Sequence, residues 1–255
     1  MKRVLLTGAE GRIGTALRTH LADRYELHSL TLEPQDFPSH VGDIADLEQI
    51  RPAFEGMDAV VHLAAAAKVT SPWSEILPAN IVGTYNVFEA SRQTEVGQVV
   101  FASSNHAIGM YEVDGAPGIY ELDDPRVYDE RVEPRPDSLY GVSKVYGEAL
   151  GRYYAEQHGL RVICLRIGSV NDDDDPTRPL ELEASPSKLR TDDEKRRRTR
   201  AVWLSQRDCA ELVAVALESE LPWAVVYGIS DNPRQMWDLA SARALGYRPR
   251  DSAPE

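Results

Sequence analysis

Short apolar runs alternate with amphipathic stretches along most of the chain. Runs typical of buried strands begin at Val4 and cover residues 26–32, 59–63, 99–103 and 162–167. Helical periodicity covers residues 15–22, 74–91 and 143–157 between them, and His40-Val41-Gly42-Asp43-Ile44 suggests one further short strand. This alternation predicts an α/β fold, a doubly wound parallel sheet with helices on both faces.

Three glycines follow the first strand in the run Thr7-Gly8-Ala9-Glu10-Gly11-Arg12-Ile13-Gly14. Gly8 permits a tight turn, Gly11 lets a pyrophosphate approach the backbone, and Gly14 lets the next helix pack close to the sheet. The amides of Arg12 and Ile13, at the start of that helix, are then available to phosphate oxygens. The position of the motif after the first strand predicts dinucleotide binding.

The carboxyl-terminal part of the chain is less regular. Residues 171–199 hold four successive aspartates, several prolines and few apolar residues, which predicts a long loop. The loop is either a mobile cover over the substrate site, with its basic end turned inward, or a solvated stretch of opposite charges. A helix over 207–217, a strand over 224–227 and a short helix over 237–245 follow. We expect residues 1–170 to form a dinucleotide-binding core and residues 171–255 a small substrate lobe.

Tyr140 and Lys144 are the most informative pair in the chain, within Ser138-Leu139-Tyr140-Gly141-Val142-Ser143-Lys144. A helix places residues four apart on one face, so an ammonium lies beside a phenol. A fixed cation lowers the pKa of a tyrosine from its usual value of about 10. Such a pair is a general base for oxidising an alcohol. The spacing alone also fits a solvated lysine beside a half-buried tyrosine.

Polar residues follow the strand over residues 99–103. Ser104, Asn105 and His106 come after Phe101-Ala102-Ser103, at the edge that faces the ligand in open parallel sheets. Ser104 is placed to donate a hydrogen bond to a reacting sugar oxygen, and Asn105 and His106 offer further polar contacts to the substrate. The same residues also fit an ordinary turn.

Together, these residues resemble the extended short-chain dehydrogenase/reductase superfamily, the NAD-dependent epimerases and dehydratases. One branch, the uronate dehydrogenases and the haloarchaeal NAD-dependent glucose-6-phosphate dehydrogenases, is similar in the blocks Phe-Ala-Ser-Ser-Asn-His, Ser-Leu-Tyr-Gly-Val-Ser-Lys, Arg166-Ile167-Gly168-Ser169 and Trp203-Leu204-Ser205. The resemblance spans nearly the whole chain. It implies oxidation of the C1 hemiacetal of a sugar to a lactone, with hydride transfer to NAD.

The resemblance also implies roles for individual residues. Tyr140 takes the hydroxyl proton, Ser104 orients the oxygen, and Lys144 lowers the pKa of the tyrosine and holds the nicotinamide ribose. Further cofactor contacts are expected at Leu63, Ala64, Ala65 and Ile167. Because the crossover helices over 74–91 and 143–157 form the usual dimer bundle of this superfamily, a homodimer or higher homo-oligomer is expected.

The far end of the sugar distinguishes the two kinds of enzyme in this branch. Ser169 agrees with the uronate dehydrogenases, and Arg198 lies where the family places an arginine that grips a carboxylate, with Arg200 close enough to compete. An arginine fork binds phosphate equally well. Segments more similar to the glucose-6-phosphate dehydrogenases are residues 117–140, 151–154 and 226–232.

Lys68, after the strand over 59–63, is either an extra cation for a phosphate or a solvated surface residue. We expect glucose 6-phosphate as the substrate, with glucuronate or galacturonate as the alternative. A sugar-nucleotide epimerase or dehydratase is a further alternative, against which the short carboxyl-terminal half argues.

Acidic residues near the second and third strands bear on the cofactor. Glu33 follows the strand over 26–32, where a carboxylate accepts from both ribose hydroxyls and repels a 2′-phosphate, which favours NAD over NADP. Glu33-Pro34 also fits an ordinary turn. Asp43 either bonds the adenine or caps the helix that starts near Ala45, and Ile44 beside it is expected at the cofactor.

Composition narrows the class of protein. A formal net charge of -13 argues against a nucleic-acid partner, because such a surface repels phosphate backbones. No apolar run approaches the roughly 20 residues of a membrane helix and no secretory segment is evident, so a cytoplasmic protein is expected. Cys164 and Cys209 have no metal-like spacing, and no metal site is expected. Acidity with only five lysines is typical of halophilic proteins, although ordinary acidic proteins overlap this range.

Overall fold

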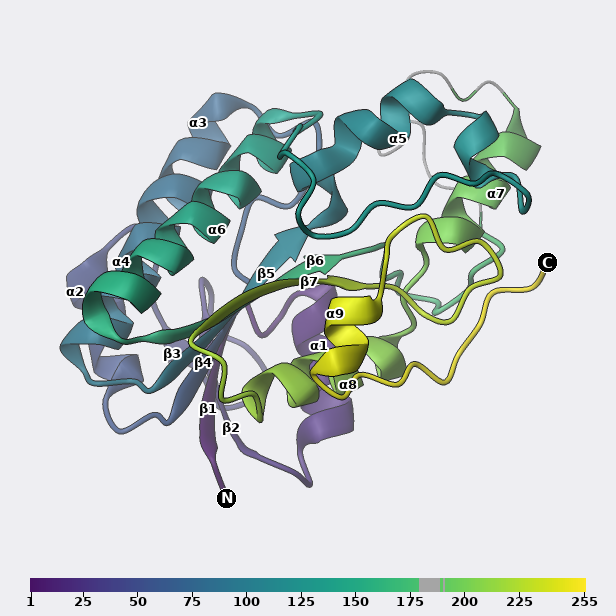
Figure 1. Cartoon of the computed structure of the whole chain (residues 1–255). Coiled ribbons are helices and arrows are strands. Elements are labelled where there is room, and N and C mark those ends of the chain that lie inside the picture. Colours follow the sequence, from purple (N-terminus) through teal and green to yellow (C-terminus); the bar gives the residue numbers. More distant parts are fainter. Residues whose placement is uncertain (179–188, 190) are drawn as a thin grey trace.

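The computed structural model describes residues 1–178, 189 and 191–255. Its strands form one parallel sheet in the order β3-β2-β1-β4-β5-β6-β7 (Figure 1). The strands are β1 (Arg3–Thr7), β2 (Glu26–Thr31), β3 (His40–Val41), β4 (Ala59–His62), β5 (Gln98–Ser104), β6 (Arg161–Ile167) and β7 (Trp223–Gly228). The doubly wound α/β fold predicted from the alternation is confirmed.

Helices cover both faces of the sheet, with α1 and α8 on one face and α4 and α6 on the other (Figure 1). The α-helices are α1 (Arg12–Leu21), α2 (Leu47–Ile50), α3 (Trp73–Ile76), α4 (Gly83–Gln93), α5 (Gly109–Gly115), α6 (Leu139–His158), α7 (Asp192–Val202), α8 (Gln206–Leu217) and α9 (Ala240–Ala244). Short helical turns of other types are η1 (Arg51–Phe54), η2 (Leu77–Val82), η3 (Asn105–Ile108) and η4 (Gly118–Tyr120).

Alternate side chains of each strand enter two different cores. Leu6 of β1 belongs to the core that includes Leu17 of α1 and Leu212 of α8. Its neighbour Leu5 points to the opposite face and belongs to the core that includes Phe88 of α4. A parallel sheet is buried on both faces, which explains why its strands read as continuous apolar runs.

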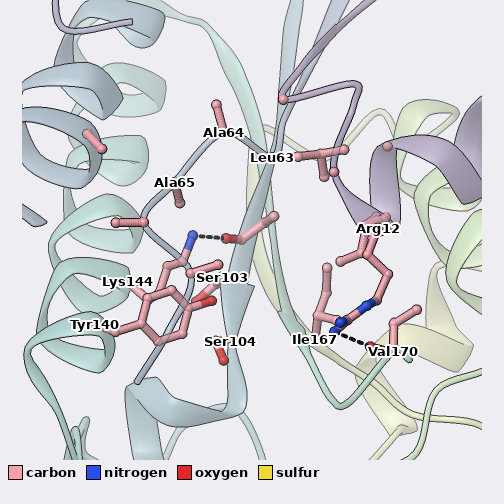
Figure 2. A pocket seen from close by; sticks show the side chains of 18 of the residues that line it. Arg12, Leu63, Ala64, Ala65, Ser103, Ser104, Tyr140, Lys144, Ile167 and Val170 are labelled. Atoms are coloured by element: carbon pink, nitrogen blue, oxygen red, sulfur yellow. Dashed lines mark hydrogen bonds between the residues drawn. The ribbon is translucent and has the colours of Figure 1, made fainter. Parts of the chain in front are cut away.

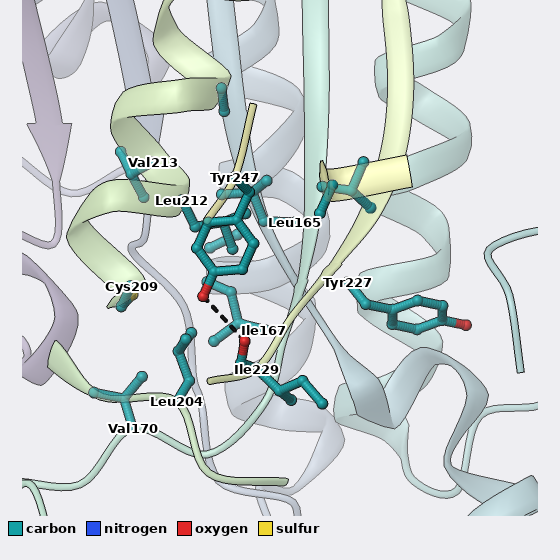
Figure 3. Close-up of a cluster of buried hydrophobic side chains, with 14 of the residues drawn as sticks. Leu165, Ile167, Val170, Leu204, Cys209, Leu212, Val213, Tyr227, Ile229 and Tyr247 are labelled. Carbon is teal, nitrogen blue, oxygen red and sulfur yellow. Dashed lines mark hydrogen bonds between the residues drawn. The ribbon is translucent and has the colours of Figure 1, made fainter. Parts of the chain in front are cut away.

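The carboxyl-terminal residues complete the sheet and the first core. Strand β7 pairs in parallel with β6, from Val162 opposite Trp223 to Ile167 opposite Gly228. Figure 3 shows Tyr247 close to α8, with its hydroxyl donating to the carbonyl oxygen of Ile229 over 3.0 Å. These residues therefore pack as one unit with the amino-terminal part, and their role as a substrate lobe stays a prediction.

The predicted long loop is wrong in its last part, because α7 occupies Asp192–Val202. A capping box starts this helix: the side chain of Thr191 accepts from the amide of Glu194, and the Glu194 carboxylate accepts from the amide of Thr191 at 2.9 Å. The basic residues at 195–198 are therefore held on a helix. The mobile cover falls largely on residues 179–188 and 190, which lie outside the described residues.

Two other helices differ from their predicted bounds. The pattern over 74–91 folds as α3, the π-helical turn η2 and α4, with Pro78 removing one amide from the helical ladder inside η2. The helix predicted over 237–245 is reduced to α9. Among the described residues, no helix has both the length and the apolar character that crossing a membrane requires.

Candidate active site

A cavity of about 770 Å³ opens at the carboxyl ends of β1, β4 and β5. Strand β1 lies between β2 and β4, so the winding of the sheet reverses there, and open α/β sheets bind ligands at this point. Every residue predicted at the site lines this cavity except Glu33 and Lys68, whose side chains are exposed outside it.

The glycine turn forms one wall of the cavity. Gly8 has a φ of 68°, and a Cβ there would lie 2.9 Å from the Cα of Ala64. A Cβ at Gly14 would lie 2.6 Å from the backbone oxygens of Gly8 and Ala9, so α1 packs directly on the turn. Gly11, the N-cap of α1, has no side chain to cap the helix, which leaves the first-turn amides to the cavity.

Arg12 reaches across the cavity to the segment after β6. Its Nε and Nη2 donate to the carboxylate of Asp172 at 2.7 and 3.0 Å. Its Nη1 donates to the carbonyl oxygen of Val170 at 3.1 Å (Figure 2). The two sides of the cavity are therefore tied together beside the glycine turn.

Asp43 and Glu33 lie differently with respect to the cavity. Asp43 lines it, and its Oδ1 accepts from the amide of Ala45 at 2.9 Å. The carboxylate therefore bonds the backbone of the turn before α2, whose N-cap is Asp46. The carbonyl oxygen of Glu33 accepts from the hydroxyl of Thr31 at 2.9 Å and from Nε2 of Gln35 at 3.0 Å.

Helix α6 brings Tyr140 and Lys144 to the opposite wall (Figure 2). The hydroxyl of Ser138 caps this helix by accepting from the amide of Gly141 at 3.0 Å. Gly141 allows α6 to touch η3, since a Cβ there would lie 2.3 Å from the carbonyl oxygen of His106. The Nζ of Lys144 donates to the carbonyl oxygen of Ala102 on β5 at 2.7 Å.

The pKa of Tyr140 moves in the direction opposite to the prediction. Burial raises the pKa of Tyr140 to about 12, against a smaller lowering by its hydrogen bond with Ser104. Burial lowers the pKa of Lys144 to about 8. The expected lowering of the tyrosine pKa by Lys144 is therefore wrong for this structure, because loss of hydration disfavours both charged forms. The ammonium lies 5.3 Å from the centre of the Tyr140 ring.

Ser104 ends β5 and caps the turn η3, which holds Asn105 and His106. The hydroxyl of Ser104 donates to Oδ1 of Asn105 at 3.2 Å and accepts from the amide of His106 at 3.2 Å. The Nδ1 of His106 lies 2.7 Å from Oδ2 of Asp137, which the sequence did not single out. Burial has the largest single effect on the pKa of Asp137 and raises it, but the interactions with His106, Ser138 and Arg198 together outweigh burial and lower the pKa of this carboxyl. Asp137 therefore orients the imidazole beside the cavity.

Arg198 lines the cavity from α7, whereas Arg200 is outside it and donates to the carbonyl oxygen of Glu255 at 2.7 Å. The buried carboxylate of Glu112, on α5, accepts from both Nε and Nη2 of Arg198, with Nη2 at 3.3 Å from Oε2. Ser169, which also lines the cavity, donates its amide to the carbonyl of Val202 at 2.7 Å. The structure thus brings Ser169 and Arg198 together with the predicted catalytic residues.

Comparison with known proteins identifies the family. The model of the NAD dependent epimerase/dehydratase family matches residues 4–171. The chain belongs to this family. The NAD-dependent glucose-6-phosphate dehydrogenase of Haloferax volcanii is 39% identical, over 99% of this chain and 94% of that protein. The L-arabinose 1-dehydrogenase (NAD(P)(+)) of the same organism is also 39% identical, over 99% of this chain and 98% of that protein.

A solved structure extends the similarity to three dimensions. A mutant uronate dehydrogenase from Agrobacterium tumefaciens complexed with NAD has a TM-score of 0.81 at 32% identity, covering 99% of this chain and 86% of that one. The chain is therefore an NAD-dependent sugar dehydrogenase of the epimerase/dehydratase family, and NAD is its cofactor. The glycine turn fits the group, because the bare backbone at Gly8, Gly11 and Gly14 leaves room for a pyrophosphate next to the first amides of α1.

One residue that supports the cavity, Asn80, was not predicted from the sequence, because no local sequence pattern marks it. Asn80, buried in η2, accepts from the amide of Ala66 at 2.7 Å and donates to the hydroxyl of Ser143 at 2.9 Å. The hydroxyl of Ser143 in turn donates to the carbonyl of Tyr140 at 2.7 Å. Asn80 therefore ties the loop after β4, which lines the cavity, to the first turn of α6, where Tyr140 lies.

The cysteines lie away from the cavity chemistry. Cys164 and Cys209 are free and buried, and burial raises the pKa of the Cys209 thiol to about 12. Within residues 1–178, 189 and 191–255, no group of three or more His, Cys, Asp or Glu side chains is arranged to hold a metal ion. Both thiols act as packing groups in their cores.

Proposed function

We propose that this enzyme oxidises the C1 hemiacetal of a hexose derivative to its lactone. The observation that carries the proposal is the meeting of Tyr140, Lys144 and Ser104 on one wall of the cavity that the glycine turn borders. A general base and a hydroxyl donor then face the place where NAD binds. Similarity to the glucose-6-phosphate, L-arabinose and uronate dehydrogenases supports a sugar as the small-molecule substrate.

In the proposed reaction a proton leaves the C1 hydroxyl and a hydride leaves C1, and Ser104, Tyr140 and Lys144 each have a different role. Ser104 donates a hydrogen bond to the C1 hydroxyl oxygen, and Tyr140 removes its proton as the carbonyl forms. Lys144, fixed by Ala102, supplies positive charge beside the phenolate that develops and donates toward the cofactor ribose. NAD, when bound, accepts the hydride. His106, oriented by Asp137, and Asn105 contact the sugar hydroxyls.

Glucose 6-phosphate is the substrate we favour, and a uronate is the alternative. The guanidinium of Arg198, beside Ser169, is the group proposed to contact the anionic end of either sugar. Lys68 is exposed beyond the lining of the cavity, so a contribution to phosphate binding would require its flexible side chain to reach inward. A sugar-nucleotide epimerase or dehydratase uses the same catalytic pair and remains the further alternative.

The deciding measurement is NADH formation with glucose 6-phosphate, glucuronate, galacturonate and unphosphorylated glucose, each offered with NAD and with NADP. Turnover confined to glucose 6-phosphate supports the favoured substrate, and turnover confined to the uronates supports the alternative. Silence with all four sugars contradicts the proposed reaction and directs attention to a bound cofactor that is not released.

The proposed assembly is a homodimer formed by α4 and α6. Exposed apolar side chains line the outer surface of these helices and of η2, namely Val82, Tyr85, Val142 and Tyr153, which are 39, 45, 44 and 54% exposed. Such a row is typical of an association surface. Light scattering after size-exclusion chromatography tests it, and Tyr153→Glu is expected to shift a dimer to monomer.

Two further features of the proposal concern the cell and the solvent. We place the enzyme in the cytoplasm, and its net charge of -13 with five lysines supports function in concentrated salt. Repulsion among the surface carboxylates is then screened. Activity and thermal unfolding measured from low to molar salt test this, and full stability without added salt contradicts it.

A further inference from the structure

Arg198 is a cation buried beside the substrate end of the cavity. Arg198 is only 3% exposed to solvent, and it lines the cavity. A buried guanidinium without a counter-ion is costly, so the groups that compensate its charge decide what else it can bind. The carboxylate of Glu112, which is only 1% exposed, compensates the charge of Arg198.

Glu112 is fixed by two partners. Its Oε1 accepts from the hydroxyl of Tyr120 at 2.7 Å and from Nε of Arg198, and its Oε2 accepts from Nη2 of Arg198. The pair joins α5 to α7 across 86 positions of sequence. Because these bonds use Nε–H and one hydrogen of Nη2, a substrate oxygen would accept from Nη1 or from the second hydrogen of Nη2.

A second carboxylate acts on the same cation. Asp137, bonded to His106, interacts electrostatically with Arg198. The cluster therefore holds one guanidinium, from Arg198, and two carboxylates, from Glu112 and Asp137, and carries no excess positive charge. A phosphate or carboxylate at this end of the sugar gains the hydrogen bonds of Arg198 but meets two nearby carboxylates.

We propose that Glu112 is a specificity-determining residue that partly compensates the charge of Arg198, so that the far end of the sugar is bound through directional hydrogen bonds and an anionic sugar is preferred over a neutral one by less than an uncompensated arginine would give. This role rests on the proposed oxidation of a sugar. It adds that Glu112, which does not itself contact the substrate, controls the ratio of kcat/KM for anionic sugars to that for neutral sugars.

The test compares kcat and KM for glucose 6-phosphate, glucuronate and glucose at saturating NAD. Glu112→Gln keeps the shape of the side chain and removes its charge, so kcat/KM for the anionic sugars should rise relative to glucose by on the order of tenfold. The matched control is Glu121→Gln, which removes the same charge from the exposed partner of the neighbouring Arg197 and should leave the ratio unchanged.

A double variant covers the case in which Glu112→Gln does not fold. Arg198→Gln alone leaves the Glu112 carboxylate without its counter-ion, so it should lower the ratio of anionic to neutral kcat/KM more than Glu112→Gln with Arg198→Gln, which removes both buried charges together. Equal ratios in Arg198→Gln and in the double variant mean that the charge of Glu112 does not act on the sugar, and overturn the inference.

The outcomes separate the two proposals. Turnover of a sugar by wild type, with the same ratio in a folded Glu112→Gln protein, overturns only the role of Glu112. Silence of wild type with all sugars overturns the proposed reaction and the role of Glu112 with it. Circular dichroism and NAD binding establish that each variant is folded.

Discussion

Gly141→Ala is expected to slow turnover by pushing helix α6 away from the turn η3, which Ser104 caps. The added Cβ would lie 2.3 Å from the carbonyl oxygen of His106 and 3.0 Å from its carbonyl carbon. These are backbone atoms, which cannot swing aside like the end of a side chain. Reaching an ordinary contact requires a displacement of about 1 Å.

Two opposing terms set the effect of Gly141→Ala on stability. Alanine favours a helix over glycine by about 1 kcal/mol. Overpacking against fixed atoms costs about 1–3 kcal/mol. The net loss in the free energy of unfolding is therefore about 0–2 kcal/mol. Turnover is more sensitive, because a displacement of about 1 Å at a reacting group can cost on the order of 100-fold.

Initial rates of NADH formation and unfolding in urea measure the two effects separately. The control is Gly97→Ala, where the added Cβ would meet the carbonyl oxygen of Asp58 at an ordinary 3.5 Å. This variant should match wild type in rate. If Gly141→Ala keeps the wild-type kcat, the contact of α6 with η3 does not position Tyr140, and the reasoning is refuted.

Three further predictions concern single side chains. Tyr140→Phe should lower kcat by about 10²–10⁴-fold while NAD binding, followed by calorimetry, is retained, because only the proton acceptor is removed; full activity would overturn the mechanism. Burial and the charge of Lys144 lower the pKa of His62 to about 3, so the unfolded chain takes up this proton first and stability falls as the pH drops below about 6.5, by up to about 1.4 kcal/mol per pH unit. His62→Gln should flatten that slope in urea unfolding, and an equal slope in both proteins would count against it. Glu33→Ala should relax discrimination against NADP in steady-state kinetics, whereas an unchanged preference removes Glu33 from the cofactor site.

The sequence predicted those parts of the site that depend on local geometry. The glycine turn follows from its position between a strand and a helix, and the Tyr140–Lys144 pair follows from four-residue spacing. Ser104 follows because the carboxyl ends of parallel strands meet at one edge. None of these inferences depends on contacts between segments that are far apart in the sequence.

The parts that were missed depend on such distant contacts. Glu112 is 86 positions from Arg198, and Asp137 is 31 positions from His106, so no local pattern marks either as a partner. Helix α7 was missed for a different reason. Its only apolar residues are Ala201 and Val202 at its end, so no apolar periodicity marks it, and the Thr191–Glu194 capping box was the available local signal.

A single face of α6 connects the chemistry to the core of the sheet. Tyr140, Lys144 and Glu148 follow at four-residue spacing, and each turns toward β5. Tyr140 bonds Ser104, Lys144 donates to the carbonyl of Ala102, and Glu148 accepts from the hydroxyl of Ser103 at 2.6 Å. Glu148 also forms a buried ion pair with Arg166 of β6, with bonds of 2.9 Å to Nε and Nη2.

This arrangement explains why Ser103 and Ser104, which follow one another at the end of β5, have different hydrogen-bond partners. Side chains alternate along a strand, and the hydroxyl of Ser103 is committed to Glu148, whereas that of Ser104 belongs to the turn that faces the substrate. Removing one partner of a buried ion pair costs about 3–5 kcal/mol, so the pair of Glu148 and Arg166 resists rotation or sliding of α6. Tyr140 is thereby held two helical turns from a fixed anchor, which keeps its phenol and the ammonium of Lys144 in register with the sugar oxygen that Tyr140 deprotonates in the proposed reaction.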